Sequence, residues 1–152
     1  YFNVYGPRQT YGPYSGVIAI FINRIMNDEP PIIYGDGTQT RDFTNVQDVV
    51  QASLLSLNSR SAVGEELNIA TGKPTTINEL AEMLLEILGK TRLEPKHVDQ
   101  RPGDVRHSYA DISKAMKVLG YKPRINLREG LNTLVEWYKK HAGEKEGIDE
   151  LV

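Results

Sequence analysis

Residues 101–111 read RPGDVRHSYAD, in which three side chains that can carry a positive charge and two carboxylates surround a Pro-Gly dipeptide. A Pro-Gly pair predicts a tight turn, which would leave Arg101 and Asp104 projecting from a loop just before an amphipathic helix. An arginine guanidinium fits a phosphate or a carboxylate through two hydrogen bonds, and a nearby carboxylate accepts hydrogen bonds from paired hydroxyls such as those of a ribose. The stretch therefore predicts a clamp for a nucleotide-like ligand. The alternative is a charged surface loop that closes on itself through an Arg–Asp ion pair.

The composition of the 152 residues is that of an ordinary globular protein, with 39% apolar and 25% charged residues. The formal net charge of −2 provides no general basic field, so we expect no nucleic-acid partner. The longest apolar run, residues 16–22, is too short to span a bilayer, so we expect no membrane partner. The sequence has no cysteine, which excludes disulfides, thiolate zinc sites and a cysteine nucleophile within it. We therefore expect a protein of the reducing cytoplasm.

Apolar periodicity and turn residues predict the elements of the first half of the chain. The predicted order is a strand at residues 1–4, a loop at 5–14, a helix from Ser15 to about Asn27, strands at 32–34 and 41–43 joined as a hairpin by residues 35–38, and a helix that begins at Asn45. The inward stripe of the first helix is Ile18, Phe21, Ile22 and Ile25.

The second half of the chain continues the alternation of strands and helices. The predicted order is a strand at residues 66–70, a helix opened by a capping box at Thr76 and Glu79, a strand at 92–98, a helix at 112–119 capped by Asp111, and a helix from a second capping box at Asn126 to about Lys140. The predicted inward faces of the two helices opened by capping boxes include Leu80 and Leu84 in the first and Leu134 in the second. The alternation of strands and helices indicates a mixed α/β chain that is richer in helix than in strand. We expect the loops at residues 3–9, 36–41 and 101–104 to converge on one cleft.

Three motifs carry a resemblance to a known family. They are residues 1–9 (YFNVYGPRQ), residues 35–43 (GDGTQTRDF) and residues 101–104 (RPGD), and they occur in this order in extended short-chain dehydrogenase/reductases of the NAD-dependent epimerase/dehydratase family. The chain resembles the C-terminal half of a nucleotide-sugar epimerase and is most similar to UDP-glucose and UDP-N-acetylglucosamine 4-epimerases.

This resemblance implies a fold and a division of the chain. The implied fold is α/β, with the end of a Rossmann-type parallel sheet followed by the smaller C-terminal α/β substrate-binding domain. Residues 1–142 would form the nucleotide-sugar-binding portion, with the last part of the NAD-binding domain interleaved, and residues 143–152 a charged tail. The N-terminal NAD-binding half would be absent from this sequence, and the parent protein would be a homodimer.

The resemblance also assigns roles in the first motif and in the first helix. It places Asn3 on the diphosphate-sugar, and Tyr5 and Pro7 beside the nicotinamide of NAD. Gly16 and Val17 would begin a helix whose backbone amides meet the diphosphate and uracil, as unpaired N–H groups at a helix N-terminus can do. The alternative for Asn3 is an asparagine that hydrogen-bonds its own loop. For Tyr5 and Pro7 it is aromatic and turn packing, and for Gly16 and Val17 it is an ordinary capped helix.

The remaining implied roles fall on the second and third motifs. Arg41 and Arg101 would bind the diphosphate, and Asp104 the uridine ribose. For Arg41 the competing interpretation is a structural ion pair with Asp42 or Asp36. Ser108 would lie beside the 2-substituent of the sugar, where its small side chain leaves room for an N-acetyl group; its alternative is a loop hydroxyl.

The implied chemistry is removal of hydride from C4 of the sugar by NAD and its return to the other face. This needs a Gly-rich phosphate turn and a Tyr-x-x-x-Lys pair, and the sequence contains neither. We therefore assign no catalytic residue to this chain, and none of its three histidines shows the spacing of a metal site. A dTDP-glucose 4,6-dehydratase, a UDP-glucuronate decarboxylase and a non-catalytic nucleotide-sugar-binding module remain as alternatives.

Overall fold

The computed structural model describes residues 1–9 and 16–141. The predicted cap at Ser15, most of the loop predicted at residues 5–14 and the charged tail at residues 143–152 lie outside this part of the chain. None of the described helices is long and apolar enough to cross a membrane.

Five α-helices, a 3-10 turn and seven short strands make up the described chain. The helices are α1 (Val17–Met26), α2 (Val46–Leu57), α3 (Ile77–Ile87), α4 (Ser113–Leu119) and α5 (Leu127–His141), and the 3-10 turn is η1 (Arg60–Ala62). The strands are β1 (Val4–Tyr5), β2 (Ile32–Tyr34), β3 (Thr40–Arg41), β4 (Thr44–Asn45), β5 (Thr75–Thr76), β6 (Lys96–Val98) and β7 (His107–Ser108). The chain is therefore mixed α/β and richer in helix than in strand, as the sequence predicts.

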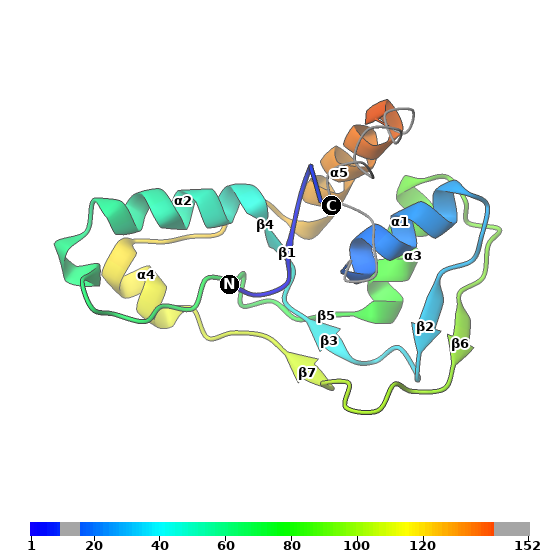
Figure 1. Cartoon of the computed structure of the whole chain (residues 1–152), viewed down its shortest axis with the longest axis horizontal. Helices are drawn as coiled ribbons and strands as arrows, with labels where there is room; N and C mark the ends of the chain where they lie inside the picture. Colours follow the sequence, from blue (N-terminus) through cyan, green and yellow to red (C-terminus); the bar gives the residue numbers. More distant parts are fainter. Residues whose placement is uncertain (10–15, 142–152) are drawn as a thin grey trace, which may run out of the picture.

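The strands form three small sheets. β1 pairs with β4 and β2 with β6, both in parallel, while β3 lies between antiparallel β5 and parallel β7. As Figure 1 shows, α2 and α4 lie together at one end of the molecule, and α1 and α3 lie with β2 and β6 at the other. The three-stranded sheet β5-β3-β7 lies between these two ends and so connects them.

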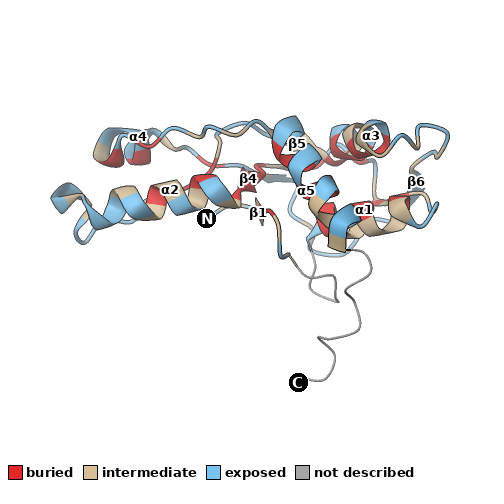
Figure 2. Cartoon of the chain, turned by 90° about the horizontal axis from the view of Figure 1, so that it is seen from above, coloured by how far each residue is buried: buried red, intermediate tan, exposed pale blue. Residues whose placement is uncertain are grey.

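The main hydrophobic core forms where α1, α3 and α5 pack together, as the buried faces of these helices show in Figure 2. Its fully buried aliphatic side chains include Ile22, Ile25, Leu80, Leu84 and Leu134, which occupy the spacing that the sequence predicts for inward faces. A second, smaller cluster joins α2 and α4 around Tyr121.

Local capping explains where several helices begin and end. The capping box predicted at α3 is present: Thr76 Oγ1 accepts from the Glu79 N–H at 3.1 Å, and Glu79 accepts from the Thr76 N–H at 2.8 Å. Asn45 caps α2 as predicted, accepting from the Gln47 N–H at 2.9 Å. At the other end of a helix, Gly120 stops α4 in the left-handed conformation that glycine adopts without strain.

The hairpin predicted across residues 35–38 is wrong. β2 pairs with the distant β6, and β3 pairs with β5 and β7, so the two strands are not partners. The Gly35–Thr38 segment is instead a loop closed by Asp36, which accepts from the N–H and hydroxyl of Thr38 at 2.9 Å each. Gly37 has a φ of 74° and faces the side chain of Asn78, where a Cβ would collide. Position 37 therefore requires glycine because α3 approaches so closely, and not because the residue belongs to a two-residue β-turn.

Several strand boundaries also differ from the predictions. The first strand begins at Val4, the strand predicted at residues 41–43 begins one residue earlier and ends at Arg41, and the one predicted at residues 92–98 shrinks to β6. Residues 66–70 form no strand, although the carbonyl of Ile69 accepts from the Phe2 N–H at 3.2 Å. Strand pairing depends on partners far along the chain, which a local pattern does not reveal.

The carboxylate of Asp42 joins three segments beside the central sheet. It is fully buried and accepts hydrogen bonds from the N–H and hydroxyl of Thr71, from the Gly72 N–H at 2.8 Å and from the Ala110 N–H at 3.4 Å. A buried carboxylate is tolerated only when donors satisfy it in this way.

We expect Asp42→Ala to lower the free energy of unfolding by about 2–4 kcal/mol, because it leaves several buried donors without an acceptor. Urea denaturation of the variant and of an Asp99→Ala control, at an exposed carboxylate, measures this. A loss below about 0.5 kcal/mol for Asp42→Ala would show that Asp42 does not organise these segments.

Two buried tyrosines should make the fold sensitive to alkaline pH. Burial raises the pKa of Tyr5 and of Tyr121 to about 12, from an ordinary value of 10.0. Because the folded state favours the neutral phenol, the stabilisation is fully present below pH 10 and is lost as the pH rises toward 12. We expect the free energy of unfolding to fall over this interval, and to fall less steeply in Tyr5→Phe. An identical slope in Tyr5→Phe would contradict the assignment to Tyr5.

Candidate functional site

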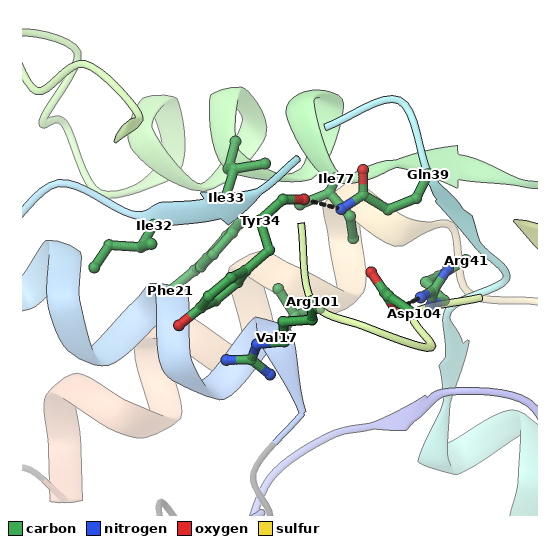
Figure 3. Close-up of a pocket in the computed structure, with 10 residues that line it drawn as sticks. All are labelled: Val17, Phe21, Ile32, Ile33, Tyr34, Gln39, Arg41, Ile77, Arg101 and Asp104. Atoms are coloured by element: carbon green, nitrogen blue, oxygen red, sulfur yellow. Dashed lines mark hydrogen bonds and ion pairs between the residues drawn. The ribbon is translucent and has the colours of Figure 1, made fainter. Parts of the chain in front are cut away.

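A pocket of about 140 Å³ lies between α1, β2 and the loop that carries Arg101 and Asp104 (Figure 3). Its apolar side is formed by side chains from α1, β2 and α3, and its polar side by Gln39, Arg41, Arg101 and Asp104. The loops at residues 36–41 and 101–104 therefore converge, as the sequence predicts, whereas no described residue of the third predicted loop, residues 3–9, lines the pocket. Arg41, Arg101 and Asp104, separated by up to 63 positions in the sequence, reach one pocket.

Arg41 and Asp104 are paired with each other in the structure. Arg41 Nη2 lies 2.8 Å from Asp104 Oδ1, and the two side chains are only 16% and 27% exposed. The structural partner of Arg41 is thus Asp104, whereas the sequence alternatives were Asp42 and Asp36. Asp42 is turned into the interior and Asp36 pairs with Arg106 instead.

The hydrogen bonds of Arg41 leave part of its guanidinium available. Nη1 donates to the carbonyls of Thr40 at 2.8 Å and of Val105 at 2.7 Å, and Nη2 donates to Asp104. A guanidinium has five N–H donors. Within the described residues, Nε and one N–H of Nη2 are not used by these bonds. Arg41 can therefore keep its place in the protein and still bind an anion.

Arg101 lies over the ring of Tyr34, with its guanidinium carbon 3.7 Å from the ring centroid. This is a cation–π contact, and it keeps the positive charge of Arg101 at the mouth of the pocket. Tyr34 is held in turn by Gln39, whose Nε2 donates to the Tyr34 carbonyl at 2.7 Å. The pocket thus combines two guanidinium groups with an aromatic ring.

The N-terminus of α1 lies beside this pocket. Gly16 is the N-cap and makes no side-chain cap, and Val17, the first helical residue, lines the pocket. The first N–H groups of a helix lack partners within the helix and carry partial positive charge. The implied roles of Gly16 and Val17 at an anionic ligand are compatible with this position and stay predictions.

Asn3 and Ser108 lie next to the segment that carries Arg41. Asn3 is exposed, has a φ of 37°, and donates through Nδ2 to the Asp42 carbonyl at 3.3 Å. Ser108 is the register partner of Arg41 across β3 and β7, and its carbonyl accepts from the Asp42 N–H at 2.9 Å. Both residues are therefore within the region of the pocket without being among its lining residues, and their ligand roles stay predictions.

Tyr5 and Pro7, the residues expected at the cofactor, differ in their surroundings. Tyr5 is 2% exposed and belongs to the main core, where its hydroxyl packs against Gly130. Pro7 is half-buried. The side chain of Tyr5 is therefore not open to a cofactor in this arrangement, whereas that of Pro7 is partly accessible.

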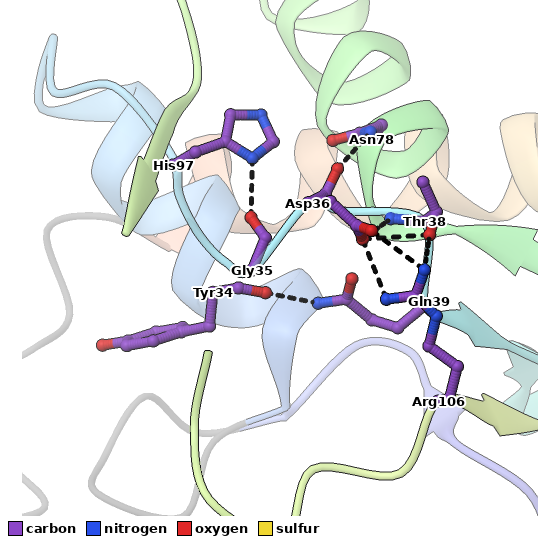
Figure 4. A network of polar contacts seen from close by, with 8 residues as sticks. All are labelled: Tyr34, Gly35, Asp36, Thr38, Gln39, Asn78, His97 and Arg106. Atoms are coloured by element: carbon purple, nitrogen blue, oxygen red, sulfur yellow. Dashed lines mark hydrogen bonds and ion pairs between the residues drawn. The ribbon is translucent and has the colours of Figure 1, made fainter. Parts of the chain in front are cut away.

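Sequence reasoning missed three polar or aromatic contributors to the site. Tyr34 and Gln39 line the pocket, and Arg106 forms an ion pair with Asp36 on the adjoining loop (Figure 4). The charge of Arg106 is visible in the 101–111 stretch, but its partner is 70 positions away. No described group of three or more His, Cys, Asp or Glu side chains could hold a metal ion.

Comparison with known proteins gives one family. The model of the family described as GDP-mannose 4,6 dehydratase matches residues 1–134. Among solved structures, UDP-glucose 4-epimerase from Thermotoga maritima with UDP-glucose is 44% identical, with a TM-score of 0.85, over 93% of this chain and 45% of its own. UDP-N-acetylglucosamine 4-epimerase from Methanobrevibacter ruminantium with UDP-N-acetylmuramic acid is 41% identical, with a TM-score of 0.83, over 92% and 44%.

Other similar proteins widen the range of chemistry. UDP-glucuronic acid 4-epimerase from Bacillus cereus, solved with UDP-glucuronic acid and NAD, is 35% identical with a TM-score of 0.83, over 91% of this chain and 43% of its own. UDP-glucuronic acid decarboxylase 6 of Arabidopsis thaliana is 37% identical over 93% of this chain and 40% of its own length. The chain thus spans less than half of each of these proteins.

Proposed function

The chain belongs to the GDP-mannose 4,6 dehydratase family, of the extended short-chain dehydrogenase/reductase type, and from this premise we propose that it is the substrate-binding part of an NAD-dependent UDP-sugar 4-epimerase. The observation that carries the proposal is the convergence of Arg41, Arg101 and Asp104 on one pocket beside the N-terminus of α1. Two cations and a helix N-terminus on one side of an apolar pocket suit a ligand with an anionic middle and a planar end.

The size of the pocket supports a pyrimidine nucleotide. At about 140 Å³ it compares with an engineered cavity of roughly 150 Å³ that binds benzene, a single six-membered ring. A uracil ring is of this size and fits the pocket. Tyr34, whose ring also carries the Arg101 guanidinium, lines the same pocket. We therefore propose UDP as the nucleotide, although the family is named for a GDP-sugar.

The diphosphate would lie between Arg41 and Arg101. Arg41 has donors beyond those bound to Thr40, Val105 and Asp104. Arg101 holds its charge over Tyr34 and forms no ion pair with a carboxylate of the described residues. Asp104, fixed by Arg41, would accept from the ribose hydroxyls. Each of these contacts holds the ligand at its nucleotide end and leaves the sugar free to turn, as exchange of the hydride between two faces of C4 requires.

The described residues fit only the border of an NAD site. The side chain of Tyr5 is buried against Gly130, so of the two implied residues only Pro7 is partly accessible. The chemistry that NAD supplies when bound is removal and return of hydride at C4. The acid–base pair and the Gly-rich turn for that chemistry are not in this sequence, so we propose that they belong to another part of the parent protein.

An exposed apolar stripe on α2 supports this division. Val50, Leu54 and Leu57 follow one another at helical spacing and are 53%, 57% and 81% exposed. Contiguous exposed apolar surface is typical of sites that pack against another part of a protein. We propose that the NAD-binding part packs here. A homodimeric parent protein stays a prediction from the family resemblance. A cytoplasmic location also stays a prediction, with the lack of cysteine as its support.

A decarboxylase is the second candidate, because relatives with that name match the same stretch with similar identity. The nucleotide site would be the same in both enzymes, since the difference in chemistry arises at the sugar. Analysis of the product formed from a UDP-hexuronic acid separates a 4-epimer from a pentose with release of carbon dioxide.

We expect Arg41→Ala and Arg101→Ala each to weaken the binding of UDP by tenfold to a hundredfold, about 1.5–3 kcal/mol, because each removes a charge-assisted contact to the diphosphate. Isothermal titration calorimetry of the chain with UDP measures this. Arg128→Ala is the matched control, since it removes an exposed ion pair with Glu86 on the distant α3–α5 surface. Unchanged affinity in both pocket variants would refute the proposed site.

We expect the parent enzyme to interconvert UDP-N-acetylglucosamine and its 4-epimer as well as UDP-glucose, because serine at position 108 leaves room for an N-acetyl group. Replacement of Ser108 by Tyr should abolish turnover of the N-acetylated sugar and spare that of UDP-glucose. Turnover of UDP-glucose alone by the unmodified enzyme would contradict this prediction.

A further inference from the structure

Beside the pocket, the Asp36 carboxylate and the Arg106 guanidinium form a two-fold hydrogen-bonded ion pair (Figure 4). Arg106 Nη1 lies 3.0 Å from Asp36 Oδ1, and Arg106 Nη2 lies 2.9 Å from Oδ2. Thr38 closes the group, since its N–H and hydroxyl donate to Asp36 and its hydroxyl oxygen accepts from Arg106. We call Asp36, Thr38 and Arg106 the clasp.

The clasp joins the two segments that form the polar side of the pocket. On one segment, Asp36 lies between Tyr34 and Gln39, which both line the pocket. On the other, Arg106 follows Asp104 by two residues. A second contact, from Asn78 Nδ2 to the Asp36 carbonyl at 3.0 Å, anchors the first segment on α3. The clasp therefore connects the loop of Arg101 and Asp104 to a segment that is anchored on α3.

Among the described residues, backbone bonds join this loop to the rest of the protein at its ends, and the Arg41 side chain adds bonds to Asp104 and to the Val105 carbonyl. The Gly35 N–H donates to the Val98 carbonyl at 2.8 Å, and the Thr40 N–H donates to the Arg106 carbonyl at 2.9 Å. Between these two points, residues 99–105 belong to no strand and include the Pro-Gly turn. In this turn the Asp104 N–H donates to the Arg101 carbonyl at 3.2 Å. A side-chain tie directly after the turn limits the movement of the loop as a whole.

The exposure of the clasp indicates what it does. The side chains of Asp36 and Arg106 are 55% and 48% exposed, and ion pairs this exposed contribute little to folding stability. Hydrogen bonds from Arg106, and next from Thr38, hold the pKa of Asp36 well below its usual range. The carboxylate is thus charged at neutral pH. An exposed but geometrically defined pair is suited to fixing the relative position of two loops.

We propose that Asp36 and Arg106 are positioning residues, which hold the Arg101–Asp104 loop against β2 and the Gly35–Gln39 segment in the arrangement that binds the nucleotide. This inference rests on the proposed function, because the ligand is the UDP group assigned there. Neither residue lines the pocket. Their effect on binding is therefore transmitted through Tyr34, Gln39, Arg101 and Asp104.

The test measures UDP affinity and thermal unfolding together in the full chain. We expect Arg106→Gln and Asp36→Asn each to weaken UDP binding by about threefold to tenfold while the unfolding temperature changes by less than about 2 °C. The double variant should lose no more affinity than either single variant, because both remove the same tie. Arg106→Lys should retain part of the affinity, since it keeps the charge but not the two-fold geometry.

A matched control is the exposed ion pair of Lys114 with Glu65 at the far end of the molecule, where the two side chains are 53% and 44% exposed. Lys114→Gln should leave UDP affinity unchanged. Wild-type affinity in Arg106→Gln, or additive losses in the double variant, would overturn the clasp while the proposed function stands. A large drop in unfolding temperature would also overturn it, because it assigns the pair a structural role. Failure of the unmodified chain to bind UDP would refute the proposed function, and the clasp with it.

Discussion

The buried carboxylate of Asp42 is the constraint on which the rest of the structure depends. Removed from water, it must be satisfied by donors, and the donors come from Thr71, Gly72 and Ala110 on two separate segments. Its neighbour Arg41, on strand β3, consequently faces the other way, into the pocket, because side chains alternate along an extended chain. One buried carboxylate thus fixes both the packing of the middle of the molecule and the direction of the side chain that we propose binds the diphosphate.

The positive charges at the pocket are only partly neutralised by the described residues of the protein. Asp104 neutralises Arg41 within the protein, and Arg101 rests on the π face of Tyr34, so the described pocket holds one paired cation and one cation kept available. A diphosphate adds negative charge where a helix N-terminus and these two guanidinium groups already face the same space. Under the proposed function, binding would need no large rearrangement of the backbone, and the position of the loop that carries Arg101 and Asp104 would determine affinity.

The predictions that the structure confirms concern features set by residues close together in the sequence. The caps at Asn45 and Thr76 and the apolar faces of α1 and α3 depend on residues within a few positions of one another, and the structure confirms them. The hairpin prediction at residues 35–38 failed because the two glycines that suggested a turn lie in a loop, where Gly37 approaches Asn78 and Gly35 approaches Gln100. For the site, the motifs singled out Arg41, Arg101 and Asp104, but the partners of Arg41 and Arg106 lie 63 and 70 positions away. Such pairings depend on tertiary packing, which periodicity does not encode.

The most direct measurement is a crystal structure of the chain with UDP-glucose bound. The account predicts uracil in the pocket against Tyr34, and the diphosphate in contact with both Arg41 and Arg101 while Asp104 accepts from the ribose. A diphosphate that contacts neither arginine, or a uracil bound outside this pocket, would contradict the central claim that these loops form a single nucleotide-binding site.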